Sequence, residues 1–585
     1  MHKQISVGSF IAPEKHNFFT ALIVRLVDRV MGLHTMQNLY QLHNFRGLTK
    51  EEFIDRSLEV LQISVADREQ LKKMIPATGS VVIASNHPFG GLEGIILARI
   101  IGEVRPDLKV LANSALSIFT EITDYFIFTN PLSQRDPKNG PSLRTSIRHL
   151  RANGALLVFP AGKVSYCDAK TGRIVEHQWD RLIGRLLQLP NIHYVPIFVS
   201  GKNSKWFYRV ERVYFKLRMA LLAREILNKK GQEIQISMGN VVTSKRIQHT
   251  SADTELAALA RAQSYAADPQ WRSAWPQVDQ QSFQAIAEPT DASVLQQELR
   301  ALPERQCLLS YREFTVYFGF RKQMPNVVRE IARLRERVFR EYNEGSGQSL
   351  DTDHFDDTYT HLLVFNHATG AIVGAYRMGQ TDKLLAQYAS DDQDLSPIYL
   401  SQMFQFQPAF INRSQPCLEM GRSFLIPEYQ RSYQGLYLLW RGIGSFVCLH
   451  PQYRYLYGTV SLSKLFDKRS IALIKAALVE TNDSVTPKND FDFPLHPEIS
   501  QFGECYSLRS HLSTFLQGIE PDGKDIPVLL KHYMKLGAKF HALGVDQNFA
   551  DTPGLLLSVH LPSAPRHMIA KYLSKNADDY IHYQD

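Results

Sequence analysis

The sequence is poor in cysteine and has no long apolar run. Its five cysteines, spread over 585 residues, are odd in number, and their spacing matches neither a zinc site nor a disulfide framework. No apolar run approaches the roughly 20 residues that a membrane-spanning helix needs. The first residues also lack the pattern of a secretory signal. We therefore expect reduced thiols, no metal site, no spanning segment and a cytoplasmic protein.

A strong excess of one charge is also missing, since Lys and Arg number 66, Asp and Glu number 58, and the formal net charge is +8. No stripe of basic and aromatic residues is present, so we expect no nucleic-acid partner. The modest positive charge suits an anionic membrane surface or an acidic carrier protein. Hydrophobic residues make up 44% and charged residues 21%, as in folded globular proteins, and the length predicts two or three domains.

A glycine-rich turn at residues 85–94 carries a histidine and a glutamate. It lies between an expected buried strand at 81–84 and an apolar helix at 95–101. His87 could take the proton of an attacking hydroxyl while Glu93 fixes the imidazole tautomer. The amides of the turn could stabilise the oxyanion that forms. The alternative is a turn histidine bonded only to its own loop.

Residues 156–165 and 194–204 each run from an apolar strand into a turn followed by a lysine. Together with the His87 turn they resemble the glycerolipid-type acyltransferase family, in its hemolysin-like branch, over roughly residues 60–245. In that family an Asn-His…Asp block carries catalysis and a Phe-Pro-x-Gly-x block binds the acceptor head group. The resemblance implies substrate-binding roles for Asn86, Phe159, Pro160, Gly162 and Lys163.

The match departs from the family pattern at two points. Five residues, in place of four, separate His87 from the acid, which is Glu93, and Ala161 replaces the usual glutamate of the head-group block. A basic residue between the two blocks helps to hold the acceptor's anionic group in the family, and Arg135 is the closest match. An Arg fork suits a carboxylate or phosphate. A solvated loop charge is the alternative for Arg135.

Residues 18–33 have helical periodicity with a wide apolar face that Arg25, Asp28 and Arg29 interrupt. Such a helix could lie in a membrane interface with its arginines at the head groups. It could equally pack on the domain that follows.

The second half shows another pattern, after a stretch at 246–305 that we expect to be a helical linker. The order of elements is that of the GNAT acyltransferase fold: a helix at 325–339, a hairpin over 361–377, a strand at 418–426, a helix at 436–443 and a strand at 455–460.

Residue detail over roughly 310–575 resembles the ornithine N-acyltransferase branch, which is related to the acyl-homoserine lactone synthases. The blocks that carry this resemblance are Arg-x-x-Val-Phe at 335–339, Asp-x-Phe-Asp at 353–356, His-Leu-Leu-Val at 361–364, Glu-Met-Gly-Arg-Ser at 419–423 and the tail at 527–538. The turn at 430–435 lacks the usual GNAT pantetheine spacing, which leaves acyl carrier protein and CoA open as donor. The kinship and the net charge favour acyl carrier protein, and we expect no bound cofactor.

Amide formation requires a neutral amine, so a base or carboxylate relay is expected, and Glu419 is the candidate. A structural pair with Arg422 is the alternative for Glu419. Asp353 and Asp356 could bind the ammonium groups of an amino acid or could cap a turn. Arg337 and Arg422 could hold a carboxylate or a carrier phosphate.

These patterns predict an α/β protein with two catalytic domains. We divide the chain into an N-terminal helix region at 1–45, an O-acyltransferase domain at 46–245, the linker at 246–305 and a GNAT-like N-acyltransferase domain at 306–585. Such a pairing resembles the bifunctional ornithine lipid synthases of bacteria. It implies that the C-terminal domain N-acylates ornithine with a 3-hydroxyacyl group from acyl carrier protein. The N-terminal domain then O-acylates the lyso-ornithine lipid, peripherally on the cytoplasmic face of the inner membrane.

Three alternatives stay open. The amino acid could be glycine, serine or lysine. The protein could be a lysophospholipid acyltransferase with an accessory GNAT-like domain. It could also be a membrane-docked scaffold without catalytic activity.

Overall fold

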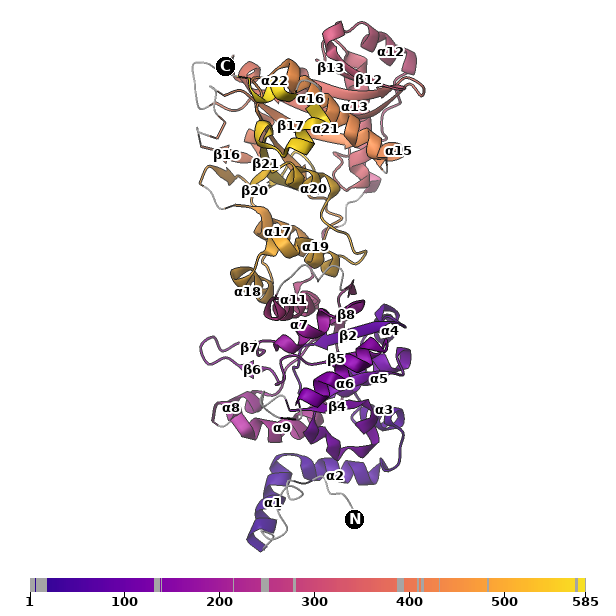
Figure 1. Ribbon diagram of the computed structural model, residues 1–585, viewed down its shortest axis with the longest axis vertical. Helices are drawn as coiled ribbons and strands as arrows, with labels where there is room; N and C mark the ends of the chain where they lie inside the picture. Colours follow the sequence, from indigo (N-terminus) through magenta and orange to yellow (C-terminus); the bar gives the residue numbers. More distant parts are fainter. Residues whose placement is uncertain are drawn as a thin grey trace. The chain divides into compact units, whose positions relative to one another are not determined.

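The computed structural model describes most of the chain, namely residues 6, 18–130, 137, 139–213, 215–243, 252–276, 280–386, 394–407, 410–411, 415–430, 432–480, 483–573 and 577–583. It separates into two compact units (Figure 1). The first unit comprises 1–272 and 495–524, and the second comprises 273–494 and 525–585. The units therefore depart from the linear division expected around 246–305, because one segment of the second half belongs to the first unit. No helix among the described residues is long and apolar enough to cross a membrane.

A mixed sheet forms the centre of the first unit. In the described residues it has seven strands in the order β10-β8-β2-β5-β3-β4, with β11 also paired to β8. The strands are β2 (Ser80–Ser85), β3 (Lys109–Asn113), β4 (Phe126–Thr129), β5 (Ala155–Val158), β8 (Ile192–Val199), β10 (Ile236–Met238) and β11 (Val242–Thr243). β2, β3, β4, β5 and β8 are parallel, whereas β10 and β11 run antiparallel to β8. Every residue of β2 is buried, as expected for a central parallel strand covered on both faces.

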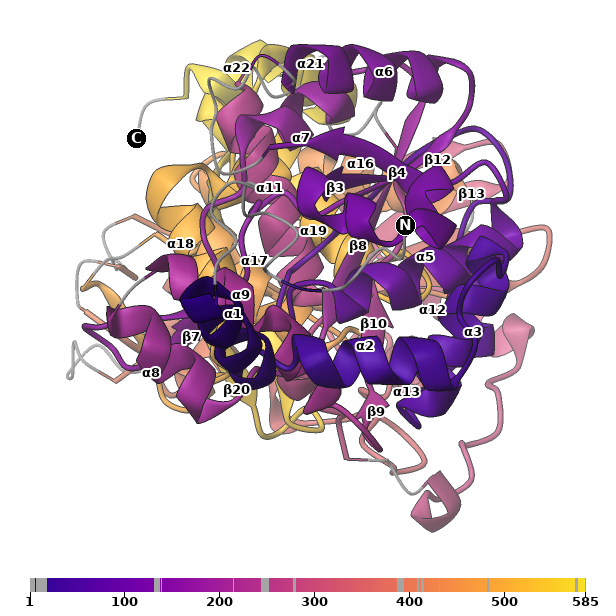
Figure 2. The ribbon, with the colours of Figure 1, turned by 90° about the horizontal axis from the view of Figure 1, so that it is seen from below.

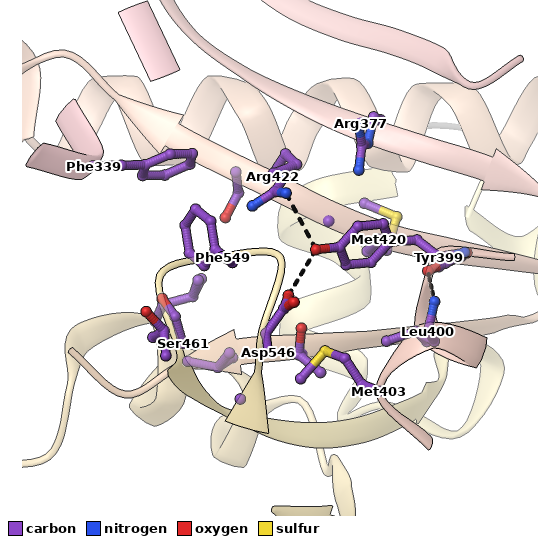
Figure 3. A pocket seen from close by; sticks show the side chains of 18 of the residues that line it. Phe339, Arg377, Tyr399, Leu400, Met403, Met420, Arg422, Ser461, Asp546 and Phe549 are labelled. Carbon is purple, nitrogen blue, oxygen red and sulfur yellow. Dashed lines mark hydrogen bonds between the residues drawn. The ribbon is translucent and has the colours of Figure 1, made fainter. Parts of the chain in front are cut away.

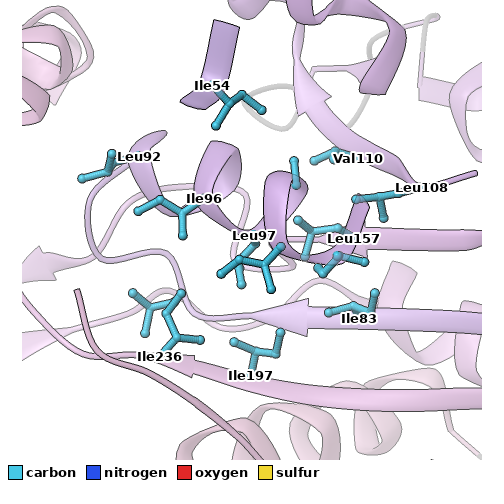
Figure 4. Close-up of a cluster of buried hydrophobic side chains, with 14 of the residues drawn as sticks. Ile54, Ile83, Leu92, Ile96, Leu97, Leu108, Val110, Leu157, Ile197 and Ile236 are labelled. Carbon is cyan, nitrogen blue, oxygen red and sulfur yellow. The ribbon is translucent and has the colours of Figure 1, made fainter. Parts of the chain in front are cut away.

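Helices cover this sheet on both faces. Among the described residues, the helices of the first unit are α1 (Phe18–Val30), α2 (Leu33–Leu42), α3 (Lys50–Val60), α4 (Arg68–Met74), α5 (Leu92–Val104), α6 (Asn139–Arg151), α7 (Arg181–Leu187), α8 (Lys205–Val213), α9 (Phe215–Leu227), α11 (Asp253–Ala266), α18 (Pro497–Cys505) and α19 (Leu508–Ile519). On one face, Ile96 and Leu97 of α5 pack over Ile83 and Ile197 in an extensive apolar cluster (Figure 4). Two short ladders lie outside the sheet, β1 (Ser64–Val65) with β9 (Glu233–Ile234) and β6 (Tyr166–Cys167) with β7 (Ile174–Val175).

The second unit is built on an eight-stranded sheet in the described residues, with the order β12-β13-β14-β15-β17-β18-β21-β20. Its strands are β12 (Cys307–Tyr311), β13 (Phe314–Gly319), β14 (Thr360–Asn366), β15 (Ala371–Gln380), β17 (Cys417–Leu425), β18 (Tyr455–Ser461), β20 (Lys539–Asp546) and β21 (Thr552–His560). A separate ladder joins β16 (Phe404–Phe406) to β19 (Val485–Pro487). The expected hairpin over 361–377 is β14 and β15, and the expected strands at 418–426 and 455–460 are β17 and β18.

The helices of the second unit are α12 (Ala292–Arg300), α13 (Pro325–Glu341), α14 (Thr381–Leu385), α15 (Pro427–Gln430), α16 (Tyr433–Leu449), α17 (Lys468–Leu478), α20 (Val528–Lys535), α21 (Arg566–Leu573) and α22 (Ala577–Ile581). Pro325 starts α13, and its buried face includes Val327, Ile331, Leu334 and Val338, as the sequence predicts. These side chains share one apolar cluster with β14, β15 and β17.

β17 and β18 are the one parallel pair of this sheet in the described residues, and they separate along their length. They pair from Cys417 to Met420 on β17 and from Tyr455 to Gly458 on β18. Beyond Gly458, β18 pairs only with β21, while β17 continues to Leu425. The two strands line a pocket where they separate.

Candidate active sites

In the first unit, His87 and Glu93 are in contact at the end of β2. The Nδ1 atom of His87 lies 3.0 Å from Oε1 of Glu93. Glu93 occupies the first turn of α5, is fully buried, and accepts hydrogen bonds from the amides of Phe89, Gly90 and Gly91 at 2.9–3.1 Å. These amides donate to the Glu93 carboxylate, and this corrects our expectation that they would stabilise an oxyanion.

The surroundings keep Glu93 ionised. Burial alone raises its pKa, but the neighbouring His87 and the amides of Gly90 and Gly91 outweigh burial and lower the pKa to about 2. An ionised acceptor at Nδ1 favours the tautomer that carries its proton on that nitrogen. The other ring nitrogen, Nε2, is then free to accept a proton.

The main chain of His87 is held by a residue that the sequence did not single out. Its amide donates to Oε1 of Glu176 at 2.7 Å, and its carbonyl accepts from the amide of Ser165 at 3.0 Å. Glu176 is buried, and its other oxygen accepts from Trp179 Nε1 at 2.9 Å and from the Tyr265 hydroxyl at 3.1 Å. Glu176 is 89 positions from His87 and belongs to no recognisable motif.

The side chain of Asn86 is bonded to the main chain of β8. Its side chain donates to the carbonyl of Val199 at 2.9 Å and accepts from the Val199 amide at 2.7 Å. Both polar groups of this buried amide are therefore engaged with β8, so the residue ties the ends of β2 and β8 together. We had expected it to bind substrate.

The predicted head-group block adjoins the histidine. The Phe159 ring lies 4.7 Å from the His87 ring, and Gly162 adopts a positive φ of 63° in the turn that follows Pro160. Lys163 is half-buried in this turn. Arg135 lies outside the described residues.

Two cavities lie near the His87 turn and the head-group block. An almost wholly apolar cavity of about 110 Å³ includes Gly91 and Ile95 in its lining, together with side chains from α2, α3 and α9. A polar cavity of about 210 Å³ includes Thr129, at the end of β4, and Asp180, the N-cap of α7. The amide of Asp180 donates to the carbonyl of Pro160, which connects the polar cavity to the head-group block.

In the second unit, Glu419 is buried on β17. Its Oε1 accepts from the Leu400 amide at 2.8 Å, and its Oε2 accepts from the Tyr399 amide at 3.1 Å and from the Tyr359 hydroxyl. Burial raises the pKa of Glu419 to about 7, against the opposing effect of these donors and of Arg377. This carboxyl can therefore exchange a proton near neutral pH.

The pocket between β17 and β18 has a volume of about 80 Å³, and Glu419 belongs to its lining. Figure 3 shows Tyr399, Arg422 and Asp546 in this pocket. Within it the Tyr399 hydroxyl donates to Asp546 Oδ2 at 2.7 Å and accepts from Arg422 Nη2 at 3.1 Å. Burial raises the pKa of Asp546. Arg422 sits at a positive φ of 48°, where the pairing of β17 with β15 shifts register. The pocket therefore offers two carboxyl groups and two guanidinium groups, those of Arg377 and Arg422, and neither Asp546 nor Arg377 was found from the sequence.

The predicted ammonium ligands are part of an ionic cluster. Asp356 is fully buried and accepts from Arg335 Nη1 and Nη2 at 2.9 and 2.8 Å, with Arg377 Nη1 at 3.2 Å. Burial raises the pKa of Asp356, but the two arginines and His361 reverse this and hold it far below its usual range. Asp353 pairs with Arg377 and caps the turn that contains Asp356. Of the two roles that the sequence left open for Asp353 and Asp356, the contacts favour turn capping, because the two residues form a capping box and the oxygens of Asp356 already have buried partners.

The two nearby arginines of α13 differ from our assignment as well. Arg337 is 37% exposed, pairs with the exposed Glu428 at 2.9 Å, and does not line the pocket. Arg335, which we did not select, is 1% exposed and joins Asp351 and Asp356. Arg422 is the predicted arginine that reaches the pocket.

Residues 9–270 match the family described as Acyltransferase, and residues 334–441 match the acetyltransferase (GNAT) domain. The chain is an acyltransferase. Its first unit carries an acyltransferase domain and its second a GNAT domain, which confirms the expected enzyme class and the two-domain α/β fold.

The chain is similar to two kinds of acyltransferase from Bacteroides thetaiotaomicron and Phocaeicola vulgatus. A glycine N(alpha)-acyltransferase of Bacteroides thetaiotaomicron is 29% identical over 307 residues, which are 47% of this chain and 86% of that protein. A lyso-glycine lipid O-acyltransferase of Phocaeicola vulgatus is 21% identical over 263 residues, 43% of this chain and 89% of that protein. The chain is thus homologous to aminolipid acyltransferases, and none of these names includes ornithine.

Among solved structures, a CoA-dependent acyl-homoserine lactone synthase, BjaI, matches 46% of this chain and 89% of its own at 12% identity. The TM-score is 0.24. This likeness is too distant to support an argument.

Proposed function

We propose that this chain makes an aminolipid by two successive acylations, with ornithine as the first amino acid to test. The second unit transfers a 3-hydroxyacyl group to the α-amine, and the first unit esterifies the hydroxyl of the resulting lyso-lipid. The observation that carries this proposal is that each unit has its own buried carboxylate, Glu93 beside His87 in the first unit and Glu419 beside Tyr359 in the second. Glu419 lines the pocket of the second unit, and Gly91 and Ile95, each two residues from Glu93, line the apolar cavity of the first. The names of the relatives support the same pair of reactions, N-acylation followed by O-acylation.

In the N-acylation, the amine nitrogen attacks the carbonyl of an acyl thioester. The C–N bond forms, the C–S bond breaks, and the nitrogen loses a proton that finally reaches the departing thiolate. Glu419 receives this proton, since its pKa of about 7 makes it a carboxylate for part of the time at neutral pH. The Tyr359 hydroxyl bonded to it can relay the proton.

In the O-acylation, Nε2 of His87 accepts the proton of the lyso-lipid hydroxyl as the hydroxyl oxygen attacks the second thioester. The C–O bond forms, the C–S bond breaks, and the imidazolium returns its proton to the thiolate. Glu93 stabilises the imidazolium in the meantime because it stays ionised. The apolar cavity at Gly91 suits an acyl chain, as its lining is almost wholly hydrocarbon.

Ornithine and glycine differ by a second ammonium group, and the pocket of the second unit has an additional carboxyl to meet it. Arg422 suits the carboxylate of the amino acid, and Glu419 the reacting amine. Asp546 is left to bind the side-chain ammonium of ornithine. The ammonium would replace the Tyr399 hydroxyl, which donates to Asp546 in this structure. Glycine is the second candidate, because the relatives carry its name.

The proposed acyl donor is acyl carrier protein. Leu529 at the start of α20 lines the pocket, and the exposed Lys535 lies on the same helix. Lys571 of α21 is close enough to His532 to contribute, with burial and Lys535, to a His532 pKa of about 4. A cationic surface beside the pocket suits an acidic carrier.

We also propose that α1 docks on an anionic membrane surface. Phe19, Leu22, Ile23 and Leu26 are 57–74% exposed on one face of this helix. α1 lies beside α9 (Figure 2), and Arg224 Nη1 of α9 donates to the carbonyl of Val30 at 3.2 Å. A helix with such an uncovered apolar face gains free energy by entering the interface.

Membrane docking is tested with vesicles of anionic phospholipid. The double variant Leu22→Asp/Leu26→Asp should bind at least about tenfold more weakly, because two charges enter the apolar face. Val528→Asp is the control, since Val528 is 74% exposed in the second unit. Equal binding of both variants would remove α1 as the docking element.

The overall function is tested in a bacterium that lacks aminolipids and expresses the wild type, His87→Ala or Glu419→Ala. Extracted lipids are analysed by mass spectrometry. The wild type should produce a diacylated ornithine lipid, His87→Ala should stop at the lyso-lipid, and Glu419→Ala should reduce both. A glycine lipid in place of the ornithine lipid would select the second candidate, and no new lipid would reject the proposal.

A further inference from the structure

A helical pair from the second half of the sequence packs in the first unit. α18 and α19 lie between β19 and α20 along the chain, yet both contact α11. The inner side of α11 meets the sheet, where the Tyr194 hydroxyl of β8 donates to the Ala260 carbonyl at 2.8 Å. Almost every residue of α11 from Leu256 to Ala266 is buried. α18 and α19 therefore cover a helix that is itself packed against the catalytic sheet.

Polar contacts fix this cover in place. Three of them join parts of the first unit that are far apart in sequence: Arg261 Nη2 to Glu498 Oε1 at 2.7 Å, His511 Nε2 to Glu255 Oε1 at 3.0 Å, and Asn240 Nδ2 to the Gln517 carbonyl at 2.8 Å. The first is the most enclosed, with side chains that are 9% and 15% exposed.

Arg261 connects Glu498 to the residue that holds the catalytic histidine. Its Nη2 also donates to the carbonyl of Glu176 at 3.2 Å, and its guanidinium lies 5.7 Å from the centre of the Tyr265 ring. The Tyr265 hydroxyl donates to the Glu176 carboxylate, and that carboxylate accepts the amide of His87. The contacts thus run without a break from Glu498 through Arg261 and Glu176 to His87.

We propose that Glu498 is a positioning residue for O-acylation, an inference that rests on the function proposed above. Without the Glu498 carboxylate, the buried guanidinium of Arg261 is left beside Glu176, whose carbonyl it contacts and with whose carboxyl it interacts electrostatically. Movement of Glu176 toward Arg261 takes its oxygen away from the His87 amide. The imidazole then leaves the position set by Glu93, and a displacement of this size slows the chemical step.

The test compares Glu498→Gln with Glu504→Gln, which makes the same charge change at an exposed position of the same helix. In the purified full chain, Glu498→Gln should lower kcat for O-acylation on the order of ten- to a hundredfold, with KM unchanged. N-acylation by the same preparation should stay at the wild-type rate. Identical kinetics for the two variants would overturn the inference, as would an equal loss of both activities.

A second measurement is independent of activity. Hydrogen exchange in the peptide that spans residues 85–94 should be faster in Glu498→Gln than in Glu504→Gln, because the His87 amide loses its acceptor. Unchanged exchange there would reject the positioning role even in an active enzyme. Absence of O-acylation in the wild type would instead reject the proposed function, so the two failures can be told apart.

Discussion

Glu93 in the first unit and Glu419 in the second are both almost fully buried, yet their pKa values move in opposite directions. Burial acts to raise both. At Glu93 the imidazole of His87 and the turn amides reverse the effect and bring the pKa to about 2. At Glu419 a tyrosine hydroxyl and two amides offset only part of it, and the pKa stays at about 7. The groups in contact, more than the depth of burial, decide what a carboxylate can do.

The same contrast separates the two chemistries. A carboxylate that is ionised at every physiological pH can orient and stabilise an imidazolium but takes no proton itself. One with a pKa near 7 can accept and release a proton during turnover. Under the function proposed above, the first unit would therefore need a separate base, His87, whereas the second could use Glu419 directly.

The largest effect is expected from His87→Ala. Loss of the base should reduce O-acylation roughly a thousandfold or more, while N-acylation stays unchanged and the lyso-lipid accumulates. The check is the rate of each half-reaction in the purified full chain. A variant that still esterifies the lyso-lipid at near the wild-type rate would move the base elsewhere.

Glu93→Gln should reduce kcat for O-acylation by about a hundredfold or more, because the amide no longer stabilises the imidazolium or fixes the tautomer. Glu103→Gln is the matched control, as Glu103 lies on the same helix at the surface and pairs with Arg68 and Lys72. Steady-state kinetics of both variants, with N-acylation as an internal reference, check the assignment. Similar values for the two would leave Glu93 with a purely structural role.

A smaller effect, but the most direct contrast, is expected in the pH dependence. Glu419 must be ionised to accept a proton, so N-acylation should rise through a pH near 7 and fall on the acid side. Replacement by Gln should remove this limb and lower the rate about tenfold or more. Glu93 should add no corresponding acid limb to O-acylation, since its pKa is about 2. Initial rates of both reactions across pH 5–9 decide the point. The proposal would be contradicted if both reactions shared one acid limb and that limb persisted in both Glu419→Gln and Glu93→Gln.

Stability should respond to the same two groups with opposite signs. The folded pKa of Glu93 lies below its unfolded value, so its stabilising effect is present above about pH 4.5 and is lost as the pH falls toward 2. The folded pKa of Glu419 lies above its unfolded value, so its contribution is present below about pH 4.5 and is lost as the pH rises through about 7. Thermal unfolding at pH 5 and pH 8 should therefore show a smaller loss of stability on going to pH 8 in Glu419→Gln than in the wild type.

Local patterns in the sequence were enough to find the turn of His87 and Glu93, because strand, turn and helix follow each other within a few residues. The order of strands and helices in the second half likewise allowed the GNAT fold to be predicted. Glu176 could not be found in this way, since its link to His87 forms only when a distant loop folds onto the sheet. The same holds for the segment at 495–524, whose sequence reads as part of the second unit although it folds with the first.

The smallest effect is expected at Arg337, which the sequence interpretation assigned to substrate and which the structure places in an exposed ion pair. Residues two apart on a helix point to different sides, so Arg335 is buried on Asp356 while Arg337 pairs with Glu428 at the surface. Arg337→Ala should change stability by less than about 1 kcal/mol and leave both activities intact, as for other exposed ion pairs. Arg335→Ala should cost roughly 3–5 kcal/mol because it removes the guanidinium that donates to both oxygens of the buried Asp356 and leaves Arg377 as its remaining arginine partner. Thermal unfolding of both variants makes the comparison, and a large loss of N-acylation in Arg337→Ala alone would restore that residue to the substrate site.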